Sequence, residues 1–202
     1  MMVTSDKDIR QVIHKSLAAE YRYDKNALIV HELKVCQGEA RIDIALVNGA
    51  MHGYEIKSDR DTLERLYNQI GVYNRVFDTI TLVAGASHLE DAAAEAPPWW
   101  GIKAATLTDA GIVEIQDVRE PDINTKHDAF ALAQFLWRAE LLDLLSNYDI
   151  DKKVKRLTRP KLWAYVADHI PLDDIRKHVR HCLRGRTNWR PDALRMSGDG
   201  LC

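Results

Sequence analysis

The segment around Asn48-Gly49 constrains the fold of this chain more than any other. A run rich in β-branched and other apolar residues, 41–47, precedes the dipeptide, and a second run, 53–58, which contains Tyr54 and Ile56, follows it. Asn-Gly between two such runs is a strong signal for a β-hairpin, because both residues tolerate the left-handed backbone that tight turns require. Successive residues of a strand point to opposite faces of a sheet, so the hairpin also decides which side chains can meet.

The length of the hairpin loop sets the register of the two strands. A two-residue turn would leave Asp43 on the opposite face from Glu55. A three-residue loop, Asn48-Gly49-Ala50, pairs Val47 with Met51 and Asp43 with Glu55, and loops of this length with a left-handed glycine form a known class. We predict the three-residue loop, because it gathers the apolar side chains on one face, the core face. These side chains are Ile42, Ile44, Leu46 and Ile56.

The predicted register places Asp43, Glu55 and Lys57 together on the other face. Carboxylate oxygens are ligands that Mg²⁺ and Mn²⁺ prefer, and the backbone carbonyl of Ile56 could add a ligand. A metal held there polarises a phosphoryl oxygen and acidifies a bound water, while Lys57 orients that water or stabilises charge on the phosphate. The pattern therefore indicates a phosphodiesterase that depends on Mg²⁺ or Mn²⁺. The alternative is a solvated strand face that carries cross-strand charge pairs.

The rest of the first 118 residues predicts a mixed α/β sheet flanked by helices. Apolar residues at helical spacing indicate a helix over 6–17, and Asp61 with Glu64 forms a capping box that predicts a helix over 61–76. The β-branched run 79–84 is typical of a central strand. The remaining expected elements are extended segments at 27–31 and 99–107 and a short helix at 88–95.

At these residues the chain resembles the PD-(D/E)XK nuclease superfamily, whose signature is an Asp on one strand and (Asp/Glu)-x-Lys on the next. Asp43 with Glu55-Ile56-Lys57 matches the signature and its hairpin spacing, although Ile42 stands where the motif's proline would be. The chain also resembles a group of bacterial PD-(D/E)XK-like proteins over most of its length. The shared segments are 32–38, 41–43, 53–58, 61–63, 98–102 and 136–138. The resemblance implies a restriction-endonuclease-like core and metal-dependent hydrolysis of DNA.

Gln69 and Tyr73 resemble the Q-x-x-x-Y motif of the RecB-like branch of that superfamily. The two residues are four apart and share a helix face, with Arg65, a candidate nucleic-acid contact, one turn earlier. In the family this face borders the active site and helps to hold substrate or a catalytic group. The resemblance also implies an upstream Glu, for which Glu32 is the preferred candidate and Glu20 the alternative. The competing interpretation makes Tyr73 a core aromatic residue and Gln69 a surface residue.

Charge is distributed unevenly along the chain. Residues 1–150 carry 15 Lys and Arg against 24 Asp and Glu, whereas residues 151–190 carry 12 against 4. In the helix predicted over 171–186, an arginine stripe runs beside an apolar stripe, which suits contact with a phosphate backbone. The stripe consists of Arg176, Arg180 and Arg184. The alternative is that these arginines pair with aspartates of the acidic body.

Taken together, the patterns divide the chain into four parts. These are a nuclease core (1–118), a linker (119–127), a helical basic module (128–190) with helices over 128–148, 160–170 and 171–186, and a flexible tail (191–202). The predicted function is a Mg²⁺-dependent deoxyribonuclease of DNA repair or defence, with nucleic acid, foremost DNA, as partner. The alternative is a non-catalytic nucleic-acid-binding or partner-recruiting protein on the same fold.

Compartment and redox state follow from what the sequence contains. No apolar run approaches the about 20 residues of a membrane span, and residues 1–15 carry no signal-peptide core, so we expect a cytoplasmic protein without a membrane partner. Cys36, Cys182 and Cys202 are odd in number and far apart, which predicts neither a disulfide framework nor a zinc site.

Overall fold

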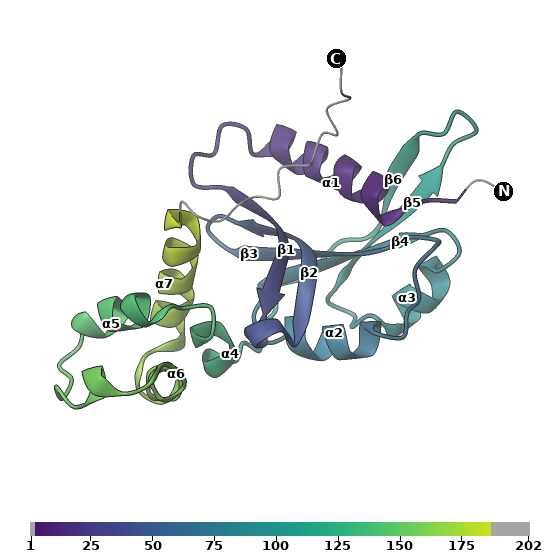
Figure 1. Ribbon diagram of the computed structural model, residues 1–202. Coiled ribbons are helices and arrows are strands. Elements are labelled where there is room, and N and C mark those ends of the chain that lie inside the picture. The colour runs from purple at the N-terminus through teal and green to yellow at the C-terminus, as the bar shows by residue number, and fades with distance from the viewer. Residues whose placement is uncertain (1–2, 187–202) are drawn as a thin grey trace, which may run out of the picture.

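The computed structural model describes residues 3–186, which form a six-stranded sheet flanked by helices (Figure 1). The strands are β1 (Leu28–Val35), β2 (Ala40–Val47), β3 (Met51–Lys57), β4 (Thr79–Gly85), β5 (Gly101–Leu107) and β6 (Val113–Arg119). They lie side by side in chain order. The pairs β3–β4 and β4–β5 are parallel, and the other neighbouring pairs are antiparallel. The prediction of a mixed α/β sheet flanked by helices is therefore confirmed.

The helices divide into two groups. Those of the first part of the chain are α1 (Asp6–Glu20), α2 (Leu66–Tyr73) and α3 (Leu89–Glu95). Those that follow the sheet are α4 (Ala129–Ala133), α5 (Arg138–Ser146), α6 (Arg159–His169) and α7 (Leu172–Gly185), with short 3-10 turns η1 (Cys36–Gly38) and η2 (Val154–Arg156). Figure 1 shows α1 on one face of the sheet, α2 and α3 on the other, and α4–α7 gathered at one end. None of the helices within residues 3–186 is both long and apolar enough to cross a membrane.

Each face of the sheet has its own core. On one face the apolar side of α1 packs against residues of β2, β3, β4 and β5, and this smaller core contains Ile9, Ile13, Leu17, Ile44, Leu46, Ile56, Val83 and Ala105. On the other face a larger core joins the sheet to α2, α3 and the C-terminal helices. Burial on both faces explains why β4, which reads Thr-Ile-Thr-Leu-Val-Ala-Gly, is buried at every position.

The predicted three-residue loop is confirmed, but the predicted Asp43–Glu55 pair does not form, and Gly49 does not have the left-handed backbone expected of such a loop. Val47 pairs with Met51, and Ile44 pairs with Tyr54, as a three-residue loop requires. The backbone N–H of Ala50 donates to the side-chain oxygen of Asn48 at 2.9 Å, which closes the loop locally.

The predicted grouping of Ile42 with Ile44 is wrong. Ile42 is buried in the larger core, whereas Ile44 faces α1. The alternation breaks because Glu32 of β1 adopts a left-handed backbone with φ of 54°. Glu32 lies between the paired positions His31–Ile44 and Leu33–Ile42, so the two strands change face at that point.

The predicted start of the second helix is also wrong. α2 begins at Leu66 and not at Asp61. The carboxylate of Asp61 accepts hydrogen bonds from the backbone N–H and the hydroxyl of Ser58, at 2.8 and 2.5 Å. It therefore closes a turn directly after β3, and it is not available to cap a helix.

The helix predicted over 128–148 is interrupted. It forms α4 and α5, because Trp137 takes an extended backbone with ψ of 163°. The side chain of Glu140 accepts from the N–H of Trp137 at 2.7 Å, and the guanidinium of Arg186 lies 4.2 Å from the centre of the Trp137 ring. The other predicted helices and strands are present, whereas β6 is absent from the prediction.

The C-terminal helices share the larger core with the sheet. The segment that leads to them is anchored by Asn124, whose side-chain amide donates to the carbonyls of Asn74 and Phe77 at 2.7 and 2.9 Å. The predicted limits of the four parts stay predictions, and the tail over 191–202 lies outside the described residues.

Candidate functional site

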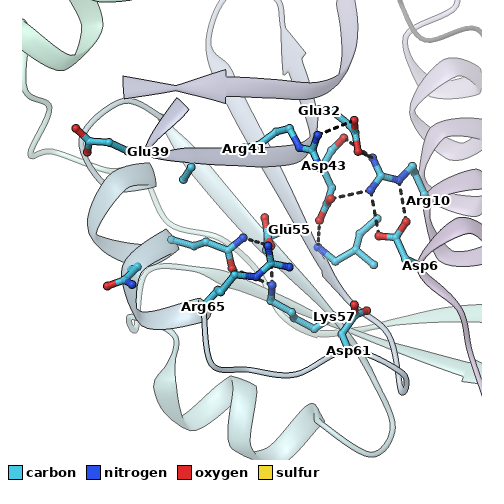
Figure 2. A pocket seen from close by; sticks show the side chains of 14 residues that line it. Asp6, Arg10, Glu32, Glu39, Arg41, Asp43, Glu55, Lys57, Asp61 and Arg65 are labelled. Carbon is cyan, nitrogen blue, oxygen red and sulfur yellow. Dashed lines mark hydrogen bonds and ion pairs between the residues drawn. The ribbon is translucent and has the colours of Figure 1, made fainter. Parts of the chain in front are cut away.

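A polar pocket of about 380 Å³ opens where β2 and β3 separate beyond the Ile44–Tyr54 pair. It is lined by residues from α1, the three antiparallel strands and α2 (Figure 2). Seven of the side chains and backbone groups singled out from the sequence meet there, namely Glu32, Asp43, Glu55, Ile56, Lys57, Arg65 and Gln69. Tertiary structure therefore brings these predicted residues to one place.

A buried hydrogen-bond network holds Glu55. Its Oε1 accepts from Lys57 Nζ at 2.8 Å and from Gln69 Nε2 at 2.6 Å. The hydroxyl of Tyr73 lies 2.9 Å from Glu55 Oε2 and 2.8 Å from the carbonyl of Arg41, so its single proton can serve either acceptor. Lys57 also donates to Gln69 Oε1 at 2.8 Å. Tyr73 is thus both a core aromatic residue, fully buried, and a direct partner of the site.

Asp43 is held from the opposite side by α1. Its Oδ1 accepts from Arg10 Nη2 at 2.7 Å, and its Oδ2 accepts from the backbone N–H of Ile56 at 2.7 Å. The Asp43 carboxylate therefore accepts the hydrogen bond that the Ile56 N–H would otherwise donate to a carbonyl of β2. This replacement keeps β2 and β3 apart. Arg10 also pairs with Asp6, one turn earlier on α1, at 3.1 Å. That i,i+4 pair was the only sequence signal for Arg10, and it did not connect Arg10 to the site.

Glu32 reaches the pocket because its backbone is left-handed. Its carboxylate lies 3.2 Å from Arg41 Nη1 and 3.9 Å from Arg10 Nη1. A non-glycine residue in this backbone region costs on the order of 1–3 kcal/mol, which the surrounding contacts must offset. The structure thus places the preferred upstream Glu at the site, whereas Glu20, at the end of α1, does not line the pocket.

Burial dominates the electrostatics of both carboxylates. Burial and the nearby Glu55 raise the pKa of Asp43 to about 7, although Arg10 and the Ile56 N–H act in the other direction. Burial also raises the pKa of Glu55, against the opposing effects of Lys57, Tyr73 and Gln69. The pKa of the Tyr73 hydroxyl is raised by burial and by Glu55, which keeps it a hydrogen-bond donor.

The predicted Mg²⁺ or Mn²⁺ site stays a prediction, and the two carboxylates that would hold the ion already have cationic partners. Each carboxylate is already compensated, Asp43 by Arg10 and Glu55 by Lys57. Within residues 3–186 no group of three or more His, Cys, Asp and Glu side chains is arranged to hold a metal ion. A divalent ion between the carboxylates would have to compete with two ammonium or guanidinium groups, so we derive no metal-dependent step from the pocket.

The predicted arginine stripe lies elsewhere, at the junction between α7 and the sheet. Arg176 pairs with the buried Asp78 at 2.5 Å and with Asp173 at 2.9 Å. Arg184 donates to the backbone carbonyl of Asn48, in the hairpin loop, at 2.9 Å. For Arg176 the alternative interpretation therefore holds, because this arginine pairs with aspartates of the acidic body.

Comparison with known proteins assigns the family. The sequence model described as "Bacteriophage P4 protein cII" matches residues 4–196. The chain belongs to this family. One relative, Protein cII of Enterobacteria phage P4, is 27% identical over 191 residues, which cover 88% of this chain and 68% of the phage protein. No solved structure matches the chain.

The family assignment corrects the nuclease prediction. The match is to the phage P4 cII family and not to a PD-(D/E)XK family, so the resemblance drawn from Asp43 and Glu55-Ile56-Lys57 is wrong as a family assignment. The prediction of a Mg²⁺-dependent deoxyribonuclease is wrong on the same grounds. A physical reason is that both motif carboxylates already have cationic partners, Lys57 for Glu55 and Arg10 for Asp43. The family favours the non-catalytic alternative.

Proposed function

We propose that this chain is a non-catalytic nucleic-acid-binding protein. Its α/β part serves as a scaffold, and the order of α1, β1–β3, α2 and β4 supports the expectation of a restriction-endonuclease-like core. The pocket beside Asp43 and Glu55 is then a polar cluster that ties α1 and α2 to the hairpin. The binding surface lies on the C-terminal helical module.

One observation carries the proposal, the chemistry of residues 152–161, here called the basic segment. In ten residues the segment has six cations and no acid: Lys152, Lys153, Lys155, Arg156, Arg159 and Lys161. All six are exposed. None forms an ion pair with an acidic side chain among residues 3–186. Six cations without an acidic partner on a short stretch suit a polyanion, although Arg159 also contacts Gln37 and the Trp163 ring.

The backbone of the basic segment is fixed, so its cations are presented from a defined surface. Arg138 of α5 donates to the carbonyl of Lys155 at 2.7 Å and also to that of Leu157. The side chain of Asp151 accepts from the N–H of Lys153 at 2.8 Å. Holding the backbone lowers the ordering cost of binding, because only side chains have to be fixed when the polyanion arrives.

The proposed mode of binding is electrostatic and independent of base sequence. Lysine and arginine that contact phosphates release condensed counterions, so affinity falls with salt by a slope of about 0.9 per phosphate contacted. Six cations set an upper limit of about 5 for this slope in duplex DNA. Within the segment η2 is a single turn, and only Arg159 and Lys161 belong to a longer helix, at the start of α6.

The test is fluorescence anisotropy with short labelled duplexes, between roughly 50 and 200 mM salt. We expect binding by the wild type with a steep salt dependence, and intact DNA after incubation with Mg²⁺. Replacing four cations of the segment with Gln should lower the slope by up to about 4 and weaken binding. These are Lys152, Lys153, Lys155 and Arg156.

The matched control removes four exposed cations near α1 instead, Lys7, Lys15, Arg22 and Lys25. Equal losses in both variants would show that only net charge matters, which contradicts a defined binding surface. A wild type that binds no nucleic acid at low salt would reject the proposed function in favour of the partner-recruiting alternative.

A further inference from the structure

The arginine row of α7 contains one residue, Arg180, whose side chain has no polar partner among the described residues. The apolar positions Ile175, Val179 and Leu183 are buried and fix the orientation of the helix against the core. The row Arg176, Arg180 and Arg184 runs beside them at i,i+4 spacing. Its two outer members reach the sheet, Arg176 at Asp78 and Arg184 at the carbonyl of Asn48.

Arg180, between them, is half-buried and has no side-chain hydrogen bond or ion pair with any other residue of the described range. A guanidinium carries five N–H donors, and those of Arg180 bond to no other residue of the described range. Burial lowers the pKa of Arg180, and the charges of Arg176 and Arg184 lower it further, whereas Asp78 and Asp173 act in the other direction. The donors of Arg180 are therefore available to an anion.

Two further cations of α7, Lys177 and Arg184, lie beside a second pocket. This pocket, of about 520 Å³, lies between α5 and α7 and is also lined by His181. The one carboxylate that lines this pocket, Asp174, accepts a hydrogen bond from Tyr148 at 2.6 Å. The cationic surface thus continues from the arginine row round α7.

We propose that Arg180 is the centre of a phosphate-binding site on α7, which contacts the backbone of the nucleic acid held by the basic segment. This inference rests on the proposed function. A phosphate oxygen pair matches the planar guanidinium fork in a bidentate contact, and it supplies acceptors for donors that have none among the described residues. Arg184 and Arg176 add attraction from one turn on either side.

The test compares the variants Arg180→Gln and Arg180→Lys with the wild type in the same anisotropy titration. Arg180→Gln should weaken duplex binding roughly eightfold at about 0.1 M salt and lower the salt slope by about 0.9, since one phosphate contact is lost. Arg180→Lys should keep the slope and lose affinity, because the charge remains and the bidentate contact does not. Arg22→Gln, an exposed arginine after α1, is the control and should change neither quantity.

Thermal unfolding without nucleic acid separates a binding role from a structural one. Removing a half-buried charge that has no polar partner among the described residues should leave the midpoint of Arg180→Gln equal to that of the wild type or higher. If the site binds free phosphate, inorganic phosphate added alone should raise the wild-type midpoint more than that of Arg180→Gln. If only duplex DNA has this effect, the site binds the phosphates of the DNA backbone. Both results support the proposed site.

If Arg180→Gln binds duplex with the affinity and the salt slope of the wild type, the proposed site is overturned. The variant of the basic segment then still tests the proposed function. If Arg180→Gln unfolds at a lower temperature, Arg180→Lys decides, and wild-type affinity in that variant overturns the site. A wild type that binds no duplex rejects the proposed function and this site together.

Discussion

The junction between α7 and the sheet depends on one buried carboxylate, Asp78. Its side chain is 5% exposed, and it accepts from the N–H of Met51 at 2.6 Å and from Arg176 at 2.5 Å, with His127 Nε2 at 3.2 Å. Asp78→Asn should remove the negative charge and leave Arg176 partly buried beside a neutral amide. Losing one partner of a buried ion pair costs about 3–5 kcal/mol. In a chain of this length each kcal/mol lowers the unfolding midpoint by about 2–4 °C, so a fall of roughly 6–20 °C is expected.

The pH dependence of this variant has a defined sign. Hydrogen bonds from His127, Met51 and Arg176 hold the pKa of Asp78 well below its usual range, although burial opposes them. The carboxylate therefore contributes stability above the unfolded pKa of about 4, and this contribution is lost as the pH falls further. Asp78→Asn should lack this acid-induced loss.

The assay is urea unfolding of the wild type, Asp78→Asn, Arg176→Met and the double variant, with the exposed Asp149→Asn as control. In the double variant the two costs should not add, and the coupling should exceed about 1 kcal/mol. A loss below about 1 kcal/mol in Asp78→Asn, or additivity of the two single changes, would refute the reasoning that this pair anchors α7.

Two further predictions concern the polar pocket. Tyr73→Phe should lower the free energy of unfolding in urea by about 1.5–3 kcal/mol, because the buried carboxylate of Glu55 loses a hydrogen-bond donor. The control is Tyr67→Phe, at a residue that is 76% exposed, and it should stay within about 0.5 kcal/mol of the wild type. Burial and Glu55 raise the pKa of Asp43 to about 7, so the folded chain binds a proton there more readily than the unfolded one, and wild-type stability should fall as the pH rises from about 4 to 7, by at most about 1.4 kcal/mol per pH unit. Asp43→Asn should lack this fall, and parallel pH profiles of the two proteins would contradict the raised pKa.

Local patterns predicted most of the elements. Apolar spacing located α1, α6 and α7, and the β-branched run located β4, because these signals depend on neighbours in sequence. β6 went unpredicted although its apolar residues alternate at Val113 and Ile115, since a partly exposed edge strand buries too little to give a strong pattern. The break between α4 and α5 could not be predicted, because it depends on contacts of Trp137 with the distant Arg186.

The sequence by itself determined the hairpin and its three-residue loop, and with them the positions of Asp43, Glu55 and Lys57 along two neighbouring strands. Register follows from alternation and turn length, which are properties of short segments. Only the tertiary structure decided what those residues do. Arg10 of α1 compensates Asp43, and Gln69 and Tyr73 of α2 engage Glu55, because the two helices pack on opposite faces of the sheet. A sequence motif shows which side chains are present. Their chemistry depends on the charges and hydrogen-bond donors that folding places beside them.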